Sequence, residues 1–349
     1  GTKQKEKRKM TDYILEQLRA LVAIDSPSGF TEKVTAYVLQ ELTRLGFAPQ
    51  RTVKGGVLCC LGGSGNGLLL TGHIDTLGGM VAAVKPNGRL RISPVGGLSA
   101  NNCEAENCRV YGRFGGVVEG CLQLCSPSVH VNKNYSEEKR DFTTMEVVLD
   151  AVVHTKEETE ALGVSVGDYV CFDPRLTITE TGYIKSRFLD DKLSVAILLG
   201  LAKSISEKET VPAREVWLHV TVFEEVGHGG CASVPAGVQE ILAVDMGCVG
   251  DDLGCTETQV SICAKDSRGP YNYDMTTKLI ALAKEAKLDY AVDVYPYYGS
   301  DADAALEAGH DLRHALIGAG VYASHGYERS HKEGVKNTYQ LVKAFVETL

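Results

Sequence analysis

The sequence predicts an α/β protein whose main domain is interrupted by a β-rich insert. Helical and strand patterns alternate over most of the chain, as in proteins with helices packed on a sheet. Between about residues 78 and 174 this alternation stops, and short strand-like runs rich in Gly and Val replace it. An open α/β sheet can gather distant metal-binding side chains at one edge. Five such side chains follow apolar segments or lie in turns: His73, Asp190, Glu225, Asp245 and His331.

The first part of the chain predicts two helices and then two strands. Thr11 is expected to cap the first helix, after a solvated tail at residues 3–9. A Ser26-Pro27-Ser28-Gly29 turn separates the two helices. The second strand ends just before His73. The expected elements are helices at about 11–22 and 34–45 and strands at 57–61 and 67–71.

Residues 78–174 are expected to form a compact β-barrel-like domain with one helix near 156–162. The α/β pattern then returns. It predicts helices at about 192–206 and 276–287, strands at 215–223 and 241–245, and a closing helix that contains 341–346. The α/β domain is therefore predicted to be discontinuous, with residues 10–77 and 175–349 forming one domain around the insert.

The composition argues against two kinds of partner. With 349 residues, 44% of them hydrophobic and 23% charged, the chain can bury a large core. A net charge of −9 gives no reason to expect binding to nucleic acid or to an anionic membrane. We find no apolar run of the kind found in membrane spans or signal peptides, and the 11 cysteines are expected to be reduced. We therefore expect a cytoplasmic protein.

The first two motifs pair a candidate ligand with an acidic neighbour. In His73-Ile74-Asp75 the imidazole could bind a metal ion while the Asp75 carboxylate holds or polarises it, although a surface turn also explains these residues. Asp190-Asp191 precedes an almost wholly apolar helix, where one carboxylate could serve as an N-cap. The second would be free to bridge two cations, and we expect Asp190 to be the bridge.

Glu224-Glu225 is the sharpest local signal, because two acids follow the apolar segment 217–223 and precede a glycine-rich turn. The solvated end of a hairpin is the ordinary alternative. Neighbouring residues on a strand point to opposite faces, so the two acids should have different roles. One can bind metal while the other stays free as a base.

The last two candidates have competitors nearby. Asp245 ends an apolar strand, where a buried carboxylate would need a partner such as a metal ion. Asp251 and Asp252 follow in the next loop. His331 lies in a polar turn before the last helix, with His325 six residues earlier, and either histidine could simply be exposed to solvent.

In this order and spacing, the segments resemble the co-catalytic metallo-aminopeptidases of the glutamyl-aminopeptidase or tetrahedral-aminopeptidase family. The similarity runs from the turn at 26–29 to the last helix. The resemblance implies a zinc-peptidase fold of the phosphorylase/hydrolase-like kind, a mixed sheet sandwiched by helices, with the insert as a β-barrel-like dimerisation domain. The motifs that carry it are GHID at 72–75, LDDK at 189–192, EEVG at 224–227, VD at 244–245, GP at 269–270 and SDA at 300–302.

Carried over position by position, the resemblance implies two metal ions. One would be held by His73, Asp190 and Asp245, and the other by Asp190, Glu225 and His331. Family members usually have His-Ser-Pro after an aromatic residue at the last ligand, whereas this chain has Ser-His-Lys-Glu at 330–333. The alternative for that ligand is His325.

The resemblance also implies roles outside the two ligand sets. Asp75 would orient His73, and Glu224 would be the general base. Asp301 matches a position near the substrate pocket and is our candidate for substrate binding, although an ordinary loop aspartate explains it nearly as well. A non-enzymatic metal-binding protein would have no evident need for an unligated Glu224.

The function implied is removal of the N-terminal residue from short peptides by a dinuclear metal-dependent aminopeptidase. Two divalent cations, zinc in the first place and cobalt or manganese as alternatives, would lower the pKa of a bridging water, and Glu224 would accept its proton. The expected partners are short peptides and further copies of the chain, in a dimer that could build a tetrahedral dodecamer. The alternative is an amidohydrolase, deacetylase or carboxypeptidase that acts on a small non-peptide or blocked amide with the same metal site.

Overall fold

The computed structural model describes residues 1–349, which form two compact units. The first unit consists of residues 1–75 and 175–349, and the second of residues 76–174. The second unit corresponds to the expected insert at 78–174, with two more residues at its start. The two candidate metal ligands that flank the insert, His73 and Asp190, belong to the first unit.

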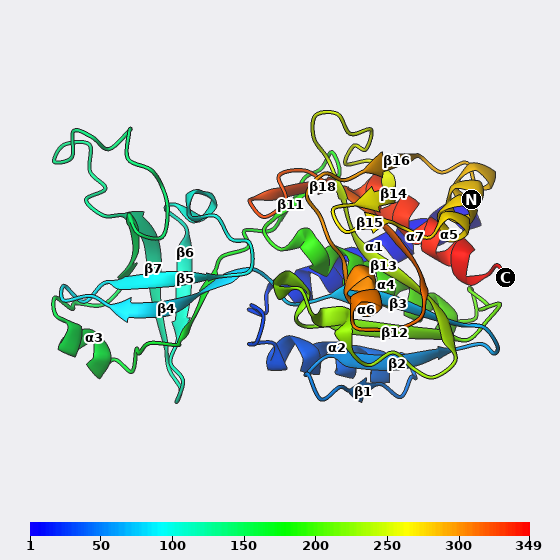
Figure 1. Cartoon of the computed structure of the whole chain (residues 1–349), viewed down its shortest axis with the longest axis horizontal. Coiled ribbons are helices and arrows are strands. Elements are labelled where there is room, and N and C mark those ends of the chain that lie inside the picture. The colour runs from blue at the N-terminus through cyan, green and yellow to red at the C-terminus, as the bar shows by residue number, and fades with distance from the viewer. The chain divides into compact units, whose positions relative to one another are not determined.

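The first unit is built on a nine-stranded mixed sheet (Figure 1). Its centre is four parallel strands, β12 (Val216–Thr221), β3 (Gly67–His73), β13 (Val238–Cys248) and β17 (Arg313–Val321). Beyond β12 lies β2 (Val57–Gly62), which runs antiparallel to β12. The edge strand β1 (Gln50–Arg51) in turn runs antiparallel to β2. Beyond β17 lies β14 (Val260–Asp266), which pairs with β15 (Gly269–Pro270) and β16 (Tyr290–Val294).

Helices cover both faces of this sheet because its strands are apolar on both sides. Along β3, Leu68 and Leu70 enter one core and Leu69 the opposite one. The core around Leu69 includes the short helix α6 (Asp301–Glu307). The larger core includes α1 (Thr2–Val22), α2 (Glu32–Arg44), α4 (Leu189–Ser206), α5 (Tyr273–Glu285) and α7 (Lys332–Val346). The predicted fold class, a mixed sheet between helices, is confirmed.

Helix α1 differs from its prediction at the N-terminus. It begins at Thr2, and the expected solvated tail at 3–9 is helical although exposed. Thr11 is not its cap, because the Thr11 hydroxyl donates to the backbone oxygen of Lys7 within the helix. A second difference is α6, which the sequence analysis missed because seven residues are too few to display a helical period.

The second unit contains a closed six-stranded barrel (Figure 1). In order around the barrel its strands are β4 (Gly78–Val84), β5 (Leu90–Val95), β8 (Met145–Leu149), β7 (Val117–Leu124), β6 (Asn107–Tyr111) and β9 (Tyr169–Phe172). The alternating run in β7 buries Gly120, Leu122 and Leu124 and leaves Cys121 and Gln123 partly exposed, as one inward and one outward face require. The helix α3 (Lys156–Ala161) begins at Thr155, which accepts a hydrogen bond from Glu158 N. The barrel-like insert is thus confirmed.

Short elements complete the first unit. A three-stranded antiparallel sheet consists of β10 (Thr177–Ile178), β11 (Tyr183–Ser186) and β18 (Glu328–His331). Three short 3-10 helices occur in the chain: η1 (Ala100–Cys103), η2 (Glu224–Val226) and η3 (Gly229–Cys231). None of the helices combines the length and the apolar composition that crossing a membrane would require.

Candidate metal centre

The parallel strands bring the predicted residues to one edge of the sheet. His73 is the last residue of β3 and pairs with Thr221 at the end of β12. Glu224 and Glu225 follow directly in the 3-10 helix η2. Asp245 lies near the end of β13, the other neighbour of β3. The carboxyl ends of adjacent parallel strands therefore form this site, as open α/β sheets generally arrange.

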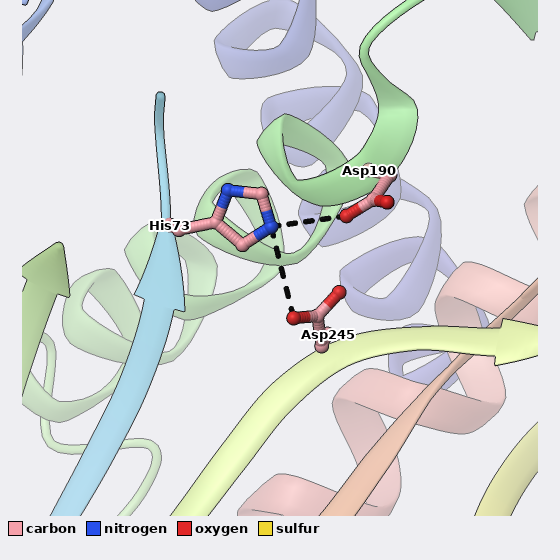
Figure 2. A group of neighbouring side chains, drawn as sticks. All are labelled: His73, Asp190 and Asp245. Carbon is pink, nitrogen blue, oxygen red and sulfur yellow. Dashed lines mark hydrogen bonds and ion pairs between the residues drawn. The ribbon is translucent and has the colours of Figure 1, made fainter. Parts of the chain in front are cut away.

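His73 lies at the centre of the site and is completely buried. Figure 2 shows one nitrogen of its ring facing the carboxylates of both Asp190 and Asp245. Its Nε2 is 3.0 Å from Asp190 Oδ1, 3.7 Å from Asp245 Oδ2 and 3.2 Å from Glu224 Oε2. Its Nδ1 lies 2.9 Å from the backbone oxygen of Asp75. A neutral ring that donates from Nδ1 would present Nε2 as a metal ligand.

The carboxylate of Asp75 fixes the turn after β12. It accepts hydrogen bonds from the backbone N of Glu224 and of Glu225, each at 3.2 Å. The Ser28 hydroxyl donates to it at 2.5 Å. Toward the His73 ring, Asp75 presents its backbone oxygen at 2.9 Å from Nδ1, and its carboxylate atom Oδ1 lies farther away, at 3.4 Å from Nδ1. Asp75 thus contacts both the histidine and the two glutamates.

A second group lies on the other side of Asp190. His325 Nε2 is 3.3 Å from Asp190 Oδ2 and 3.4 Å from Glu225 Oε2. Asp190 therefore uses one oxygen toward His73 and the other toward His325. This is the arrangement that a bridging carboxylate needs. We call His73, Asp190, Glu224, Glu225, Asp245 and His325 the His73 cluster.

The expectation for His331 has to be corrected. Its Nε2 lies 2.9 Å from the backbone oxygen of Thr181, and its Nδ1 accepts a hydrogen bond from Glu333 N at 3.0 Å. Both ring nitrogens are therefore occupied at the N-cap of α7. The cause is strand pairing: β18 runs antiparallel to β11, which places His331 opposite Tyr183. The alternative, His325, is the histidine that reaches the cluster.

Glu328 was not predicted, and it holds the second group together. Its Oε1 accepts from the backbone N of Asp190 and its Oε2 from the backbone N of His325, both at 3.0 Å. It is buried, and burial together with the charge of Asp190 raises the pKa of Glu328 to about 8. A lone glutamate in a polar segment gives no sequence signal of this kind. Its proximity to His325 emerges only from the fold.

Two further predicted acids lie beside the cluster. Asp191 is not an N-cap: no side-chain hydrogen bond caps α4, and Asp191 Oδ2 instead accepts from His73 N at 3.1 Å. Asp301 Oδ2 accepts from the Thr221 hydroxyl at 2.6 Å. The other oxygen of Asp301 presses against Gly229, where an added Cβ would come within 2.5 Å of it. Burial raises the pKa of Asp301 to about 6.

The electrostatics of the cluster are strongly perturbed. Burial raises the pKa values of Glu224, Glu225 and Asp245 well above their usual range, and repulsion between the carboxylates adds to this rise. Burial lowers the pKa of His73, but the surrounding carboxylates outweigh it and raise the pKa overall. Burial also opposes ionisation of Asp190, yet hydrogen bonds with both histidines lower its pKa. Several buried carboxyl groups thus compete for one buried imidazole.

The donor set fits divalent cations. Three sets of ligand atoms each lie within 4.8 Å of one another, and Asp190 belongs to two of them. Asp245 Oδ1 is buried without a hydrogen-bond partner. Buried carboxylates without partners are costly, whereas carboxylate oxygen and imidazole nitrogen are ordinary ligands of zinc and similar ions. Candidate sets are His73, Asp190 and Asp245; His73, Glu224 and Glu225; and Asp190, Glu225 and His325.

Known proteins resemble this chain in sequence and in fold. The family model of the M42 glutamyl aminopeptidases matches residues 55–341. YhfE of Bacillus subtilis, which is named as an aminopeptidase, is 42% identical over 336 residues that cover 96% of this chain and 97% of the relative. The TET aminopeptidase of a marine sediment archaeon of the Thaumarchaeota has a TM-score of 0.87 at 19% identity, and 97% of each chain is covered.

The TET1 peptidase of Pyrococcus horikoshii has a TM-score of 0.84 at 21% identity, with 96% of this chain and 100% of that chain covered. It can assemble into a tetrahedron or a large octahedral shell. Both solved structures have the fold of this chain, the inserted unit included within the covered length.

Proposed function

This chain belongs to the M42 glutamyl aminopeptidase family, and we propose that it acts as a dinuclear metal-dependent aminopeptidase on short peptides. The observation that carries the proposal is the position of Asp190. Its two carboxylate oxygens lie within 3.3 Å of two different histidines, each accompanied by a further carboxylate. Two three-ligand sites that share one carboxylate follow from this arrangement.

The first cation would be held by His73, Asp190 and Asp245, and the second by Asp190, Glu225 and His325. Zinc is the metal we expect, with cobalt or manganese as alternatives, because imidazole and carboxylate ligands suit all three. Bound cations would polarise the scissile carbonyl and acidify a water molecule. Asp75 supports both sets, since it contacts His73 and the backbone of Glu225.

Glu224 is the proposed general base. Glu225 is engaged with His325, and its side chain is 4% exposed, whereas the Glu224 side chain is 14% exposed. The more accessible carboxylate suits a group that must meet water and substrate. Glu224 would accept a proton from the attacking water and return it to the leaving amine. The substrate-binding role of Asp301 stays a prediction. One of its carboxylate oxygens already accepts a hydrogen bond from the Thr221 hydroxyl.

We also propose that the second unit mediates dimerisation and that dimers build a larger shell. Of 16 large exposed hydrophobic side chains, 7 belong to this unit, although it has only 99 of the 349 residues. Exposed apolar side chains that form a contiguous patch are typical of interfaces. The shells formed by the P. horikoshii TET1 peptidase support the same view. Size measurement in solution tests it, and a monomer at micromolar concentration would contradict it.

The cytoplasm is the proposed location. The structure contains no disulfide among the 11 cysteines, and several of them are buried in the cores of both units. Proteins of oxidising compartments usually pair their cysteines. This use of cysteine supports a reducing environment.

A substrate panel with and without metal tests the activity. Metal-free protein, prepared with a chelator, should not release the first residue from aminoacyl anilides or dipeptides, and zinc, cobalt or manganese should restore activity. N-acetylated substrates should resist cleavage. The same ions should raise the melting temperature, because a ligand at 100 times its Kd stabilises the native state by about 2.7 kcal/mol. Equal cleavage of blocked substrates would favour the amidohydrolase alternative, and full activity in chelator would contradict the metal site.

A further inference from the structure

Tyr298 lies in the segment that leads into α6 and is held firmly on both sides. Its backbone N donates to the Ser267 hydroxyl at 2.6 Å, and Ser267 N donates to the Tyr298 backbone oxygen at 3.1 Å. Its ring packs edge to face against Tyr295, with ring centroids 5.2 Å apart. The position of the phenol is therefore set by contacts that do not involve its hydroxyl.

The hydroxyl of Tyr298 is buried without a hydrogen-bond partner. Such a group costs stability, and an unsatisfied polar atom in a native structure calls for an explanation. The hydroxyls of other buried tyrosines have partners: Tyr13 with Glu41 at 2.7 Å, Tyr271 with Asp266 at 2.5 Å and Tyr295 with Ser261 at 2.5 Å. Tyr298 thus departs from the pattern of this protein.

The Tyr298 side chain packs against the core that contains Ala243, which lies two residues before Asp245 on β13. Burial raises the pKa of Tyr298 well above its usual value, and the nearby carboxylates of Asp245, Asp190 and Glu224 add to the rise. The phenol also opposes the rise in the pKa of Asp245, yet the two groups do not meet hydrogen-bond geometry. Tyr298 therefore offers a neutral donor beside the proposed first metal site and the proposed base.

We propose that the Tyr298 hydroxyl donates a hydrogen bond to the substrate carbonyl oxygen as that oxygen becomes the tetrahedral oxyanion. The inference rests on the proposed aminopeptidase function. The water oxygen bonds to the carbonyl carbon, one water proton passes to Glu224, and the carbonyl electron pair moves to the oxygen that Tyr298 faces. Collapse of the intermediate restores the carbonyl and breaks the C–N bond, and the amine nitrogen receives the proton from Glu224. A donor placed in advance stabilises the charge that develops on the oxygen.

The test is Tyr298→Phe, which keeps the ring and its packing on Tyr295. Loss of one oxyanion donor typically costs about 10²- to 10³-fold in kcat, and we expect about 10²-fold here with KM within about threefold of wild type. Binding of a phosphinic peptide, an analogue of the tetrahedral intermediate, should weaken by a similar factor. Metal content should stay unchanged. Tyr297→Phe, at a residue that is 93% exposed, should leave kcat unchanged.

Stability of the metal-free protein gives a readout that does not depend on activity. Because the Tyr298 hydroxyl has no partner, Tyr298→Phe should melt no lower than wild type. Tyr295→Phe removes the bond to Ser261 and should melt lower. This contrast separates a hydroxyl kept for function from one that holds the fold together.

Three results would overturn the inference. The first is an unchanged kcat in Tyr298→Phe while wild type is active. The second is a loss of kcat that follows weaker metal binding and is restored by excess metal, because Tyr298 would then only position Asp245. The third is a metal-free Tyr298→Phe protein that melts clearly lower than wild type. A wild-type protein that cleaves no unblocked substrate would overturn the proposed function itself, and this inference with it.

Discussion

Two clusters of buried acidic side chains lie in the first unit, and they differ in how their carboxylates are paired. The first is the His73 cluster. The second, which we call the Tyr271 network, links β14, β17 and the start of α6, and consists of Asp266, Tyr271, Ser300, Asp303 and His314.

The carboxylates of the Tyr271 network are satisfied by the protein itself. The Tyr271 hydroxyl donates to Asp266 Oδ2 at 2.5 Å, and its oxygen also lies 3.1 Å from Asp303 Oδ2. Arg268 N donates to Asp266 Oδ1 at 2.9 Å, and His314 Nε2 is 3.5 Å from Asp303 Oδ1. No oxygen of these two aspartates is left buried without a partner.

The carboxylates of the His73 cluster are satisfied less completely. Asp245 Oδ1 has no partner, and the pKa values of three of its acids are raised by burial and mutual repulsion. Burying carboxylates is tolerable when hydrogen bonds or cations compensate for the lost hydration. The comparison teaches that buried acids alone do not mark a metal site. A buried carboxylate oxygen without a partner, in a group of acids around a histidine, is what supports the proposed metal site, and the Tyr271 network can serve as an internal control.

The largest expected effect separates catalysis from metal binding within Glu224 and Glu225. Glu224→Gln removes the proposed proton acceptor and should lower kcat by about 10²- to 10⁴-fold with nearly normal metal content. Glu225→Gln should lower metal content, because Glu225 faces His325 in the second set. Excess metal should then rescue part of the Glu225→Gln loss and none of the Glu224→Gln loss. Kinetics and elemental analysis of the same preparations measure both effects.

The control for this pair is Asp266→Asn in the Tyr271 network. It should bind the wild-type amount of metal, because Asp266 belongs to none of the ligand groups. If Glu224→Gln loses its metal while Glu225→Gln keeps it and remains active, the two roles are reversed. Metal loss in Asp266→Asn would remove the distinction between the two clusters.

The next effect in size concerns the two histidines that compete for the last ligand. His325→Ala should weaken metal binding by at least about 10-fold, because even the partners of ligands typically matter by 10- to 100-fold. His331→Ala should leave metal affinity unchanged and cost roughly 0.5–2 kcal/mol, the usual range for loss of an N-cap. Metal titration by calorimetry and thermal melts of both variants measure the contrast. Equal metal affinity in wild type and His325→Ala would return the assignment to His331.

Much of this site was predictable because it lies on regular elements. His73 and Asp245 belong to apolar strands, and Glu224 follows another, so hydrophobic periodicity located all three. The groups of residues that could hold a metal ion contain His73, Asp190, Glu224, Glu225 and Asp245, each of which the motifs had singled out. The barrel was predictable for a similar reason, since short alternating runs and glycine turns continue over nearly a hundred residues.

The remainder depends on loop geometry, which periodicity does not encode. His325 lies in a loop with a positive φ of 65°, and its ring reaches Asp190 because the backbone bends there. Glu328 acts through backbone groups far away in the sequence. Tyr298 is only an aromatic residue in a tyrosine-rich loop until the fold brings its hydroxyl beside Asp245. Such relations are fixed by tertiary contacts, so the local sequence cannot reveal them.

The smallest expected effect is a pH dependence of stability in the Tyr271 network. Burial raises the pKa of Asp266 from 3.8 to about 7, and its hydrogen bond with Asp303 contributes to the rise. The folded protein therefore holds this proton more tightly than the unfolded chain, so the stabilisation is complete below about pH 4 and is lost as the pH rises through 7. Asp303 has a lowered pKa, so its contribution to the stability of the folded protein changes only at more acidic pH.

Asp266→Asn removes the titrating group while nearly preserving its size. We expect the melting temperature of wild type, measured relative to this variant, to fall by a few degrees between pH 5 and pH 8. About 1 kcal/mol shifts the melting temperature of a domain of 150–250 residues by roughly 2–4 °C. Calorimetry on metal-free protein is the appropriate measurement, because the titration of the His73 cluster is common to both proteins and cancels in the difference. Melting curves that shift in parallel over this range would mean that Asp266 is already ionised in the folded protein, and the two clusters would then differ less than their hydrogen bonds indicate.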